Sequence, residues 1–409
     1  MNERLTDIVE KTKLKILTSV GYYLPGYKAG GPIRTLANMV DKLGDEFQFK
    51  IITADRDFGD TKSYPGFRID GWNKVGKADV FYMSPKMRSL KEFKKVIYST
   101  ECDVIYLNSF FSPHFTIKPL LLRRLRLIPA KPLILAPRGE FSPGALGLKS
   151  LKKRVYLWVA KAFGLYRGII WQASSEHEEA DIRRWFGRGA TVAVSPDLPP
   201  VIHSADKLPP RSEKAAGCLN IVFLSRISRK KNLDGALKML KGLKGEIQFN
   251  IYGPMEDKNY WVECQKTISS VSQNIVVRYC GSVAHDKVGA VMGEHELFFL
   301  PTLGENFGHV ILEAFLAGCP VLLSDQTPWR DLEVKGVGWD LPLDVPGIFH
   351  DVLQYCVGMT QTEYANFSKC ASEYGKQVAQ DDNVVEQNRR LFYHTVDVMS
   401  SSDREQMNV

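Results

Sequence analysis

Short apolar runs alternate with amphipathic stretches along most of the chain. Runs such as Leu14–Val20, Phe47–Thr53 and Val104–Leu107 have the length and composition of buried strands, and residues at helical spacing lie between several of them. Strands that alternate with helices form parallel sheets, so the pattern predicts an α/β protein. A second series of strands begins at Leu219–Leu224, after a segment with five prolines between Pro196 and Pro210. We therefore expect two parallel-sheet domains joined by a linker.

The domain boundaries follow from the same pattern. We expect a first domain in residues 1–200, a linker at 201–216 and a second domain in residues 217–381. Helical stretches from Pro346 to Phe392 are predicted to end the fold. Residues 401–409 are polar and are expected to form a disordered tail.

One segment of the second domain has the pattern of a complete strand–loop–helix–strand unit. The apolar run Leu297–Leu300 predicts a buried strand, and a loop with Gly304 and Gly308 leads from it into an amphipathic helix. A glycine and a proline end that helix, and Pro320–Ser324 predicts the next strand. Further on, Gly338–Asp340 is predicted to be a packed turn. Ligands of such units bind at the carboxyl ends of the strands.

Two carboxylates mark the loop and helix of this unit. Glu305 lies in the loop, and Glu313 lies in the helix eight residues later. Backbone N–H groups at the start of a helix bind anions. A diphosphate at those amides, with Glu305 and Glu313 on flanking hydroxyl groups, describes a nucleotide-sugar site. The alternative is a solvated helix with two surface glutamates. The amides belong to the following residues: Asn306, Phe307, Gly308, His309 and Val310.

Other strand ends supply basic and glycine-rich turns. Arg226 to Lys231 holds four basic residues in six positions between a strand and a helix, which is typical of an anion site, although a solvated basic turn has the same composition. Gly30 and Gly31 precede a helix and allow the backbone to approach a phosphate group, although a plain turn also explains them.

Polar residues follow two strands of the first domain. Asn108 ends one predicted strand, and Arg138 and Glu140 follow another. Because ligands of an open α/β sheet bind at the carboxyl ends of its strands, these three residues are pocket candidates. In the second domain, Gly253 follows a strand in the same way, and Val283 lies in a turn after the next strand.

Several of these motifs together resemble one enzyme family. The sequence P-T-L-G-E-N-F-G-H-V-I-L-E-A at 301–314 and the R-x4-K spacing at 226–231 are similar to the donor-site signature of retaining glycosyltransferases of family 4. The stretches G-Y-K-A-G-G-P-I-R and P-R-G look like bacterial enzymes that build O-antigen, capsule or exopolysaccharide chains. The resemblance implies the GT-B fold, in which two Rossmann-like domains face each other across a cleft. A last helix, at about 382–400, is then expected to cross back to the first domain.

The resemblance also implies roles for individual residues. Glu305 corresponds to the residue that contacts the transferred sugar, and Glu313 to the one that contacts the ribose. Arg226 and Lys231 correspond to the pair that neutralises the diphosphate. The donor-binding set implied by the family and by the strand ends also contains Gly30, Gly31, Arg138, Gly253, Val283 and residues 306–310.

The first domain is expected to bind the acceptor, with Asn108 and Glu140 as candidates on that side. Many relatives have a histidine near Arg138 that touches the donor sugar. Here P-R-G stands at that place, so no catalytic base is identified.

The reaction implied is transfer of a hexose, with retained anomeric configuration, from a UDP- or GDP-linked donor to a glycan. The acceptor is expected to be lipid-linked, in bacterial surface polysaccharide synthesis. No cofactor or metal ion is expected, because two fixed cations face the diphosphate. The one D-x-D, Asp55 to Asp57, lies outside the donor half and is better explained as a charged turn.

Charge and hydropathy bear on where the protein works. The net charge is +8, and Lys118–Gly168 holds twelve basic residues against one acidic residue. Within it, Leu151–Tyr166 predicts a basic amphipathic helix with tryptophan and phenylalanine, which is typical of contact with an anionic membrane but also of a domain helix with solvated lysines. Seven irregularly spaced cysteines and the lack of a long apolar run indicate a cytoplasmic protein, with peripheral contact to the inner membrane face as a further expectation.

Three other functions compete with this interpretation. A catalytically inactive scaffold of the same fold would bind donors without turnover, and a sugar phosphorylase would use free phosphate. A nucleic-acid-binding protein would use the basic region, but helix-turn-helix, zinc and RNP signatures are missing from the sequence. We therefore expect a nucleotide sugar and a glycan or lipid-linked acceptor as partners, and no nucleic acid.

Overall fold

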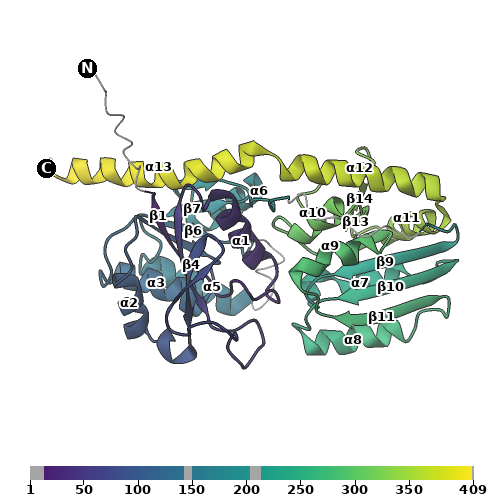
Figure 1. The fold of residues 1–409 in the computed structure, drawn as a ribbon, viewed down its shortest axis with the longest axis horizontal. Helices are drawn as coiled ribbons and strands as arrows, with labels where there is room; N and C mark the ends of the chain where they lie inside the picture. The colour runs from purple at the N-terminus through teal and green to yellow at the C-terminus, as the bar shows by residue number, and fades with distance from the viewer. Residues whose placement is uncertain (1–12, 142–149, 203–212, 408–409) are drawn as a thin grey trace, which may run out of the picture.

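The computed structural model describes residues 13–141, 150–202 and 213–407. Two α/β domains lie side by side, and two long helices, α12 and α13, run along one edge of both (Figure 1). Each domain is built on its own sheet, with strand order β3-β4-β2-β1-β5-β6-β7-β8 in the first and β11-β10-β9-β12-β13-β14 in the second.

The sheet of the first domain is parallel except at one edge, where β3 pairs with β4 in antiparallel register. Its central strands are apolar on both faces because helices cover both sides of a parallel sheet. The strands are β1 (Lys15–Ser19), β2 (Gln48–Ala54), β3 (Trp72–Val75), β4 (Ala78–Met83), β5 (Val104–Asn108), β6 (Leu133–Ala136), β7 (Ile170–Ala173) and β8 (Val192–Val194).

Helices follow most of these strands. One of them, α6, begins with Ser175 as its N-cap, and the Ser175 hydroxyl accepts a hydrogen bond from the Glu178 N–H at 3.2 Å. The helices are α1 (Gly31–Leu43), α2 (Leu90–Tyr98), α3 (Lys118–Arg124), α5 (Ser150–Ala162) and α6 (Glu176–Phe186), with short turns η1 (Pro85–Arg88) and η2 (Pro113–Ile117).

The second domain has a wholly parallel sheet of six strands. The strands are β9 (Cys218–Leu224), β10 (Glu246–Tyr252), β11 (Ile275–Gly281), β12 (Leu297–Leu300), β13 (Val321–Ser324) and β14 (Gly338–Leu341). The helices are η3 (Arg229–Lys231), α7 (Leu233–Met239), α8 (Lys258–Ile268), α9 (His285–Gly293), α10 (His309–Leu316) and α11 (Pro346–Gly358).

The chain returns to the first domain through its last two helices. Helix α12 (Gln361–Ala379) belongs to the second domain, and α13 (Asp382–Met407) packs on the first. Phe392 of α13 lies edge-on to Phe47 and Tyr106, with ring centroids 5.4 and 5.7 Å apart. Arg389 pairs with Glu46 at 2.7 Å. The two domains are therefore held together by the end of the chain as well as by the linker.

The predicted α/β class with two parallel-sheet domains is confirmed. The prediction for Gly338–Asp340 was wrong, because these residues begin strand β14, which pairs with β13. Two short edge strands, β3 and β8, were not predicted. Edge strands of three or four residues are too short to show a period in the sequence.

One predicted segment falls largely outside the described residues, and another differs from the structure. The predicted linker 201–216 falls largely on residues 203–212, which lie outside the described residues. Residues 401–407, predicted as part of a disordered tail, continue α13. Extending a formed helix by a residue costs little, because each added residue gains a backbone hydrogen bond.

Candidate functional site

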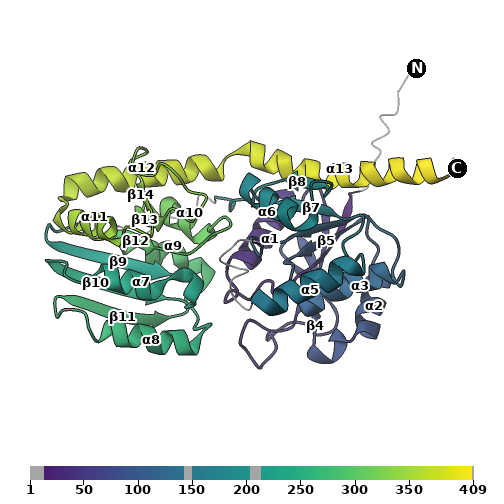
Figure 2. The same cartoon turned by 180° about the vertical axis from the view of Figure 1, so that it is seen from behind.

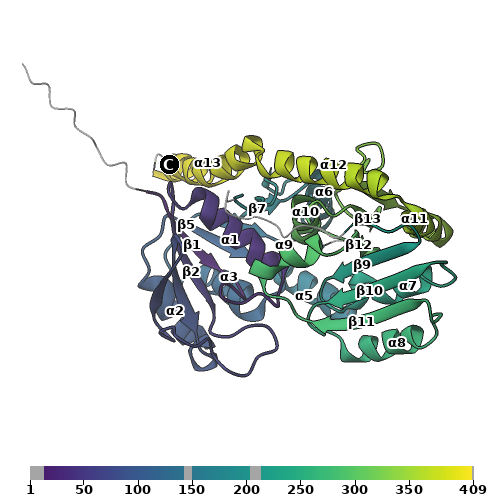
Figure 3. The same cartoon turned by 45° about the vertical axis from the view of Figure 1, so that its right-hand side comes forward.

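The loops at the carboxyl ends of both sheets meet where the two domains touch. Helix α1 of the first domain faces α9 and α10 of the second at this boundary (Figure 3). Thr35 of α1 lies with its hydroxyl 2.9 Å from Nε2 of His309, the first residue of α10. The predicted site residues can be placed relative to this contact.

Glu305 and Lys231 form an ion pair at the centre of the second domain's part of the site. Lys231 ends the turn after β9, Glu305 lies in the loop after β12, and each side chain is 11% exposed. Burial acts to raise the pKa of Glu305, but the charges of Lys231 and Lys230 outweigh it and hold the pKa below its usual value. The structure thus brings together an ionised carboxylate and a cation that the sequence analysis singled out separately, Glu305 for the sugar and Lys231 for the diphosphate.

The turn that carries Lys231 is fixed to the loop that carries Glu305. The carbonyl oxygen of Lys230 accepts hydrogen bonds from the Leu303 N–H at 2.8 Å and the Thr302 hydroxyl at 3.0 Å. Burial lowers the pKa of the Lys230 ammonium group, and the charge of Glu305 opposes that effect. Arg226, at the start of the same turn, pairs with Glu256 at 2.9 Å and is 34% exposed. Three cations therefore surround one carboxylate.

The segment 306–310 leads into α10, whose first residue is His309. A hydrogen bond from Trp329 Nε1 to the Phe307 carbonyl oxygen, at 2.6 Å, fixes the backbone at Phe307. Val310 packs against the core of the second domain. The amides of the predicted anion site thus stand at the positive end of the α10 dipole, on a segment anchored by a buried tryptophan.

Glu313 lies in α10, buried beside groups from both domains. Its Oε1 is 3.4 Å from Nδ1 of His285 in α9, and its side chain is 15% exposed. Burial raises the pKa of Glu313 to about 7, although the positive charge of Arg34 in α1 acts in the opposite direction. Nε of Arg34 is itself buried without a hydrogen-bond partner among the described residues. Arg34 and His285 were not identified from the sequence.

The raised pKa of Glu313 predicts a pH-dependent stability. Because the folded pKa, about 7, lies above the ordinary value of 4.5, the stabilising contribution is complete below pH 4.5 and is lost as the pH rises through 7. We expect the wild type to lose up to about 3 kcal/mol of unfolding free energy relative to Glu313→Gln between pH 4.5 and pH 8. Urea unfolding of both proteins at several pH values measures this difference, and a constant difference would contradict it.

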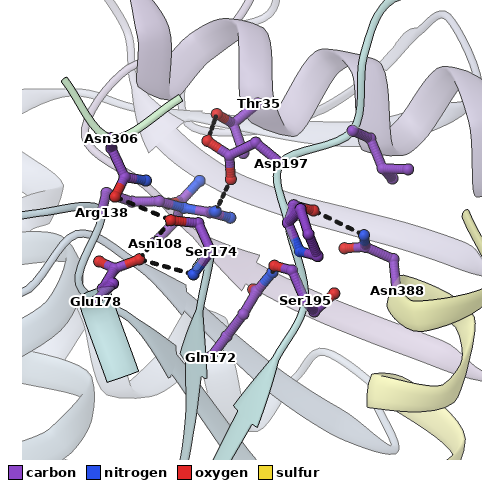
Figure 4. A network of polar contacts seen from close by, with 12 residues as sticks. Thr35, Asn108, Arg138, Gln172, Ser174, Glu178, Ser195, Asp197, Asn306 and Asn388 are labelled. Carbon is purple, nitrogen blue, oxygen red and sulfur yellow. Dashed lines mark hydrogen bonds and ion pairs between the residues drawn. The ribbon is translucent and has the colours of Figure 1, made fainter. Parts of the chain in front are cut away.

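A buried polar network joins the first domain to the second (Figure 4). Arg138 forms an ion pair with Asp197 and donates a hydrogen bond from Nε to the side-chain oxygen of Asn108 at 2.7 Å. Thr35 donates to Asp197 at 3.1 Å and also contacts His309. Burial lowers the pKa of His309 to about 4, although Asp197 opposes that effect. The network therefore runs from the sheet of the first domain to the first turn of α10.

Two predicted pocket residues are thus found beneath the site. The Arg138 side chain is 6% exposed and is held within the first domain, and Asn108 is fully buried below it. Arg138 has a left-handed backbone conformation, with a φ of 57°, and its guanidinium group contacts Asp197. In this arrangement the side chains of both residues are engaged within the network, and their contacts with a donor and an acceptor stay predictions.

A second contact between the domains involves Asn306. Its Oδ1 lies 2.9 Å from the Ser174 hydroxyl, which is 2.7 Å from Oε2 of Glu178. The other oxygen of Glu178 accepts a hydrogen bond from the Gly139 N–H at 2.5 Å. A Cβ atom on Gly139 would lie 3.2 Å from Oδ1 of Asn306, so a glycine allows this close approach. Asn306, predicted to bind the donor, also closes the domain boundary.

Glu140 stabilises the loop after β5. It accepts hydrogen bonds from the Ser109 hydroxyl at 2.6 Å and from the N–H groups of Phe110 and Phe111 at 3.0 and 2.8 Å. Burial raises the pKa of Glu140, and these hydrogen bonds act in the opposite direction. Glu140 thus holds the loop after β5, and its place on the acceptor side stays a prediction.

The predicted glycine positions divide into two kinds. Cβ atoms on Gly30 and Gly31 would meet no atom within 4 Å, so open space lies beside this turn. A Cβ atom on Gly253 would lie 1.9 Å from the Ser225 carbonyl oxygen. Gly253 is therefore needed for the approach of two strand ends, whatever binds nearby. Val283 packs against the core of the second domain.

The sequence analysis missed several residues of the network. Asp197 lies in the proline-containing segment, where composition indicated a linker. Arg34 and Thr35 follow the glycine pair, but a single helix period does not reveal that they face the other domain. Glu178 has the ordinary signature of a first-turn glutamate, although it also binds Gly139 and Ser174. The folding of the first domain and its packing against the second bring these residues together.

The described part of the chain has neither a membrane-spanning helix nor a cluster of metal-binding side chains. Among those residues, no helix combines the length and the apolar composition needed to cross a bilayer. No cluster of three or more histidine, cysteine, aspartate or glutamate side chains is placed to hold a metal ion in residues 13–141, 150–202 and 213–407.

Comparison with known proteins supports a transferase. Residues 205–339 match the family model described as Glycosyl transferases group 1. The 2-deoxystreptamine N-acetyl-D-glucosaminyltransferase of Niallia circulans is 28% identical over 137 residues, which are 32% of this chain and 34% of that protein. An uncharacterized 41.2 kDa protein in the cps region of Klebsiella pneumoniae is 24% identical over 243 residues, 56% of this chain and 62% of that protein. The chain thus spans less than two thirds of both curated relatives.

Solved structures match nearly the whole chain. Sucrose-phosphate synthase from Thermosynechococcus elongatus has a TM-score of 0.66 at 14% identity, covering 93% of this chain and 98% of that one. HepE from Anabaena, in complex with UDP and glucose, has a TM-score of 0.63 at 18% identity, covering 95% and 100%. WaaG, a glycosyltransferase involved in lipopolysaccharide biosynthesis, has a TM-score of 0.63 at 13% identity, covering 90% and 96%. The chain therefore has the GT-B fold, and its second domain matches the group 1 glycosyltransferases.

Proposed function

We propose that the chain is a glycosyltransferase that moves a hexose from a UDP- or GDP-linked donor to a glycan acceptor. The observation that carries this proposal is the buried pair of Lys231 and Glu305, with Lys230 and Arg226 around it. A diphosphate needs fixed cations, and a sugar hydroxyl needs a fixed carboxylate. Both stand here at the carboxyl ends of adjacent strands, β9 and β12.

The chemistry follows from where charge develops. Breaking the anomeric C–O bond leaves negative charge on the departing diphosphate and positive charge on the sugar. Lys231, Arg226 and the amides at the start of α10 are arranged to stabilise the first charge, and Glu305 to orient the sugar. Retention of configuration is explained by attack on the face from which the diphosphate leaves. Glu305 is thus not required as a covalent nucleophile.

We further propose that the reaction needs no metal ion. The three cations of the β9 turn already supply positive charge beside the diphosphate position. The D-x-D carboxylates are engaged elsewhere: Asp55 pairs with Arg56 at 2.9 Å and with Arg88 at 3.2 Å, and Asp57 accepts a hydrogen bond from the Tyr27 N–H at 2.8 Å. These contacts support their interpretation as a charged turn.

Nucleotide binding tests the donor proposal. Thermal unfolding is measured with UDP, GDP, ADP, TDP and CMP for the wild type and for Arg226→Ala. One nucleotide at 100 times its dissociation constant is expected to stabilise the wild type by about 2.7 kcal/mol, and the variant by less. Arg278→Ala, at an exposed position of the same domain, serves as the matched control and is expected to behave like the wild type. No stabilisation by any nucleotide would contradict the proposal.

Turnover separates this proposal from its alternatives. A transferase releases nucleoside diphosphate from the stabilising donor, whereas an inactive scaffold binds the donor without release. A phosphorylase-like enzyme would instead require free phosphate. The proposed setting is bacterial surface polysaccharide synthesis, with a lipid-linked acceptor. The roles that the names of WaaG and of the Klebsiella cps-region protein give to those proteins support this setting.

We also propose peripheral contact with an anionic membrane from the cytoplasmic side. Helix α5 exposes Trp158 by 73% and Val155 by 54%, and Phe163, the residue after its end, is 71% exposed. Lys152, Arg154 and Lys161 on the same helix are exposed as well. Exposed aromatic residues among cations are typical of helices that lie at an anionic bilayer surface.

Vesicle binding measures this contact. Co-sedimentation with vesicles of 30% anionic lipid is expected to retain the wild type at low salt and to release it as salt screens the charges. Trp158→Gln is expected to bind more weakly at every salt concentration. Val334→Asn replaces a 90% exposed residue of the second domain and should not change binding. Failure of the wild type to sediment at any salt concentration would contradict the proposal.

A further inference from the structure

An apolar groove lies on the first domain between α3 and α5, which run on the same side of that domain (Figure 2). Its volume is about 430 Å³. Leu125 and Phe163 on its rim are 53% and 71% exposed. The groove is lined by both helices, and the residues that matter here are Leu121, Arg124, Leu125, Tyr156, Val159 and Phe163.

Aromatic rings connect this groove with the acceptor-side loop. Tyr156 lines the groove, and its ring centroid is 6.0 Å from that of Phe110 and 5.9 Å from that of Phe111. The N–H group of Phe111 donates to Glu140 at 2.8 Å. One side chain thus belongs to the wall of the groove and touches the loop that Glu140 holds.

The loop faces the donor half of the site. Gly139, the neighbour of Glu140 in the chain, approaches Asn306 of the second domain so closely that a Cβ atom on Gly139 would lie 3.2 Å from Oδ1 of Asn306. Asn306 follows Glu305 in the chain, and Glu305 forms the ion pair with Lys231. Contacts through Tyr156 and Phe111 therefore connect the groove to the Glu140 loop. That loop lies against the loop of Glu305, the carboxylate that is proposed to orient the transferred sugar.

Cations accompany the apolar surface along these contacts. Nζ of Lys153 lies 5.0 Å from the centre of the Phe111 ring, between the groove and the Glu140 loop. Arg124 lines the groove and is anchored by a hydrogen bond from its Nε to the Phe163 carbonyl oxygen at 2.9 Å. An apolar trough with a lysine at the end nearest the site is complementary to a hydrocarbon chain that carries a phosphate group.

We propose that this groove binds the hydrocarbon chain of a lipid-linked acceptor, with the acceptor's phosphate beside Lys153 and its sugar at the Glu140 loop. The inference rests on the proposed glycosyltransferase function and assigns the binding of the acceptor's lipid part to this groove. The groove is thus occupied by the hydrocarbon chain of the acceptor and not by a bilayer lipid. The outer face of α5, with Trp158, is left for the bilayer surface.

Chain-length dependence of binding tests the proposal without a membrane. The probes are hexyl, octyl and decyl phosphate, each below the concentration at which it forms micelles, and affinity is measured by isothermal titration calorimetry. We expect the dissociation constant of the wild type to fall about tenfold for every two methylene groups added. The double variant Leu125→Gln, Val159→Asn should lose most of this dependence. Lys153→Met should weaken all three probes by a similar factor and keep the dependence.

Controls separate the groove from other surfaces. Both substituted residues are partly exposed, at 53% and 38%, so the double variant is expected to fold, and its thermal unfolding verifies this. Val334→Asn and Trp158→Gln should keep the chain-length dependence of the wild type. If the dependence is missing in the wild type, or persists in the double variant, the groove is not the binding site. Its loss in Trp158→Gln alone would place the chain on the outer face of α5 and overturn the proposal.

The same proteins show which proposal has failed. Nucleotide stabilisation of the double variant should equal that of the wild type, because the groove lies outside the donor half. Normal nucleotide stabilisation without chain-length dependence would refute the groove and leave the transferase proposal intact. If no nucleotide stabilises the wild type, the transferase proposal itself is refuted.

Discussion

Replacing Lys231 by methionine is expected to lower kcat for nucleoside diphosphate release by about 10²- to 10³-fold. The reason is that a fixed cation beside the departing diphosphate stabilises charge that exists mainly in the transition state. Lys231 is 11% exposed and already paired with Glu305, so its position is set before the donor arrives. Methionine has a similar length and removes the charge. The rate is measured with the donor class that nucleotide stabilisation identifies.

A lysine on the surface of the same domain provides the comparison. Nζ of Lys238 pairs with Asp234 at 2.5 Å, but its side chain is 63% exposed. Lys238→Met is expected to leave kcat within about twofold of the wild type, because water screens a charge at that position. A loss smaller than tenfold in Lys231→Met would mean that the Lys231 charge does not act on the leaving group.

Replacing Arg138 by methionine is expected to reduce the unfolding free energy by about 3–5 kcal/mol. The side chains of Arg138 and Asp197 are 6% and 4% exposed, so the substitution leaves the Asp197 carboxylate buried without its cation. Asn108 also loses the hydrogen bond that it accepts from Arg138. Urea unfolding of the wild type and the variant measures the loss.

An exposed arginine pair of the first domain serves as the control. Arg184 lies 3.4 Å from Asp181 and is 65% exposed, so Arg184→Met should cost less than about 1 kcal/mol. The experiment also distinguishes support from donor contact. If Arg138→Met keeps the stability of the wild type but weakens nucleotide binding, then Arg138 touches the donor and its role beneath the site is refuted.

The elements that the sequence predicted well are those with a local signal. The strands β9, β12 and β13 are apolar runs bounded by glycine or polar turns, and they lie where the pattern placed them. Glu305 and Lys231 were both singled out because each follows a predicted strand within a few residues. Glu305 lies in the loop after one strand, and Lys231 lies in the basic turn after another. Their mutual ion pair follows from the adjacency of β9 and β12 in the sheet.

The contacts that were not predicted join residues that are far apart in the chain. Arg138 and Asp197 are 59 residues apart, and Thr35 and His309 are 274 residues apart. No period of two or 3.6 residues encodes such pairs. Asp197 was not singled out, because the prolines around it indicated a linker. The ion pair of Arg138 was not predicted either, because a polar residue at a strand end has the same local signature whether it points outward or inward.

The chain passes between the two domains twice, and this double connection lowers the contact strength that is needed to keep the domains closed. The domains are joined once through the proline-containing segment and again at residues 380 and 381, where α12 ends before α13 begins. Two tethers make their encounter intramolecular, with an effective concentration in the millimolar range for short linkers. Contacts such as Thr35 to His309 and Ser174 to Asn306 then suffice to favour closure. Opening breaks contacts such as these, whereas separating the domains requires α13 to leave the first domain.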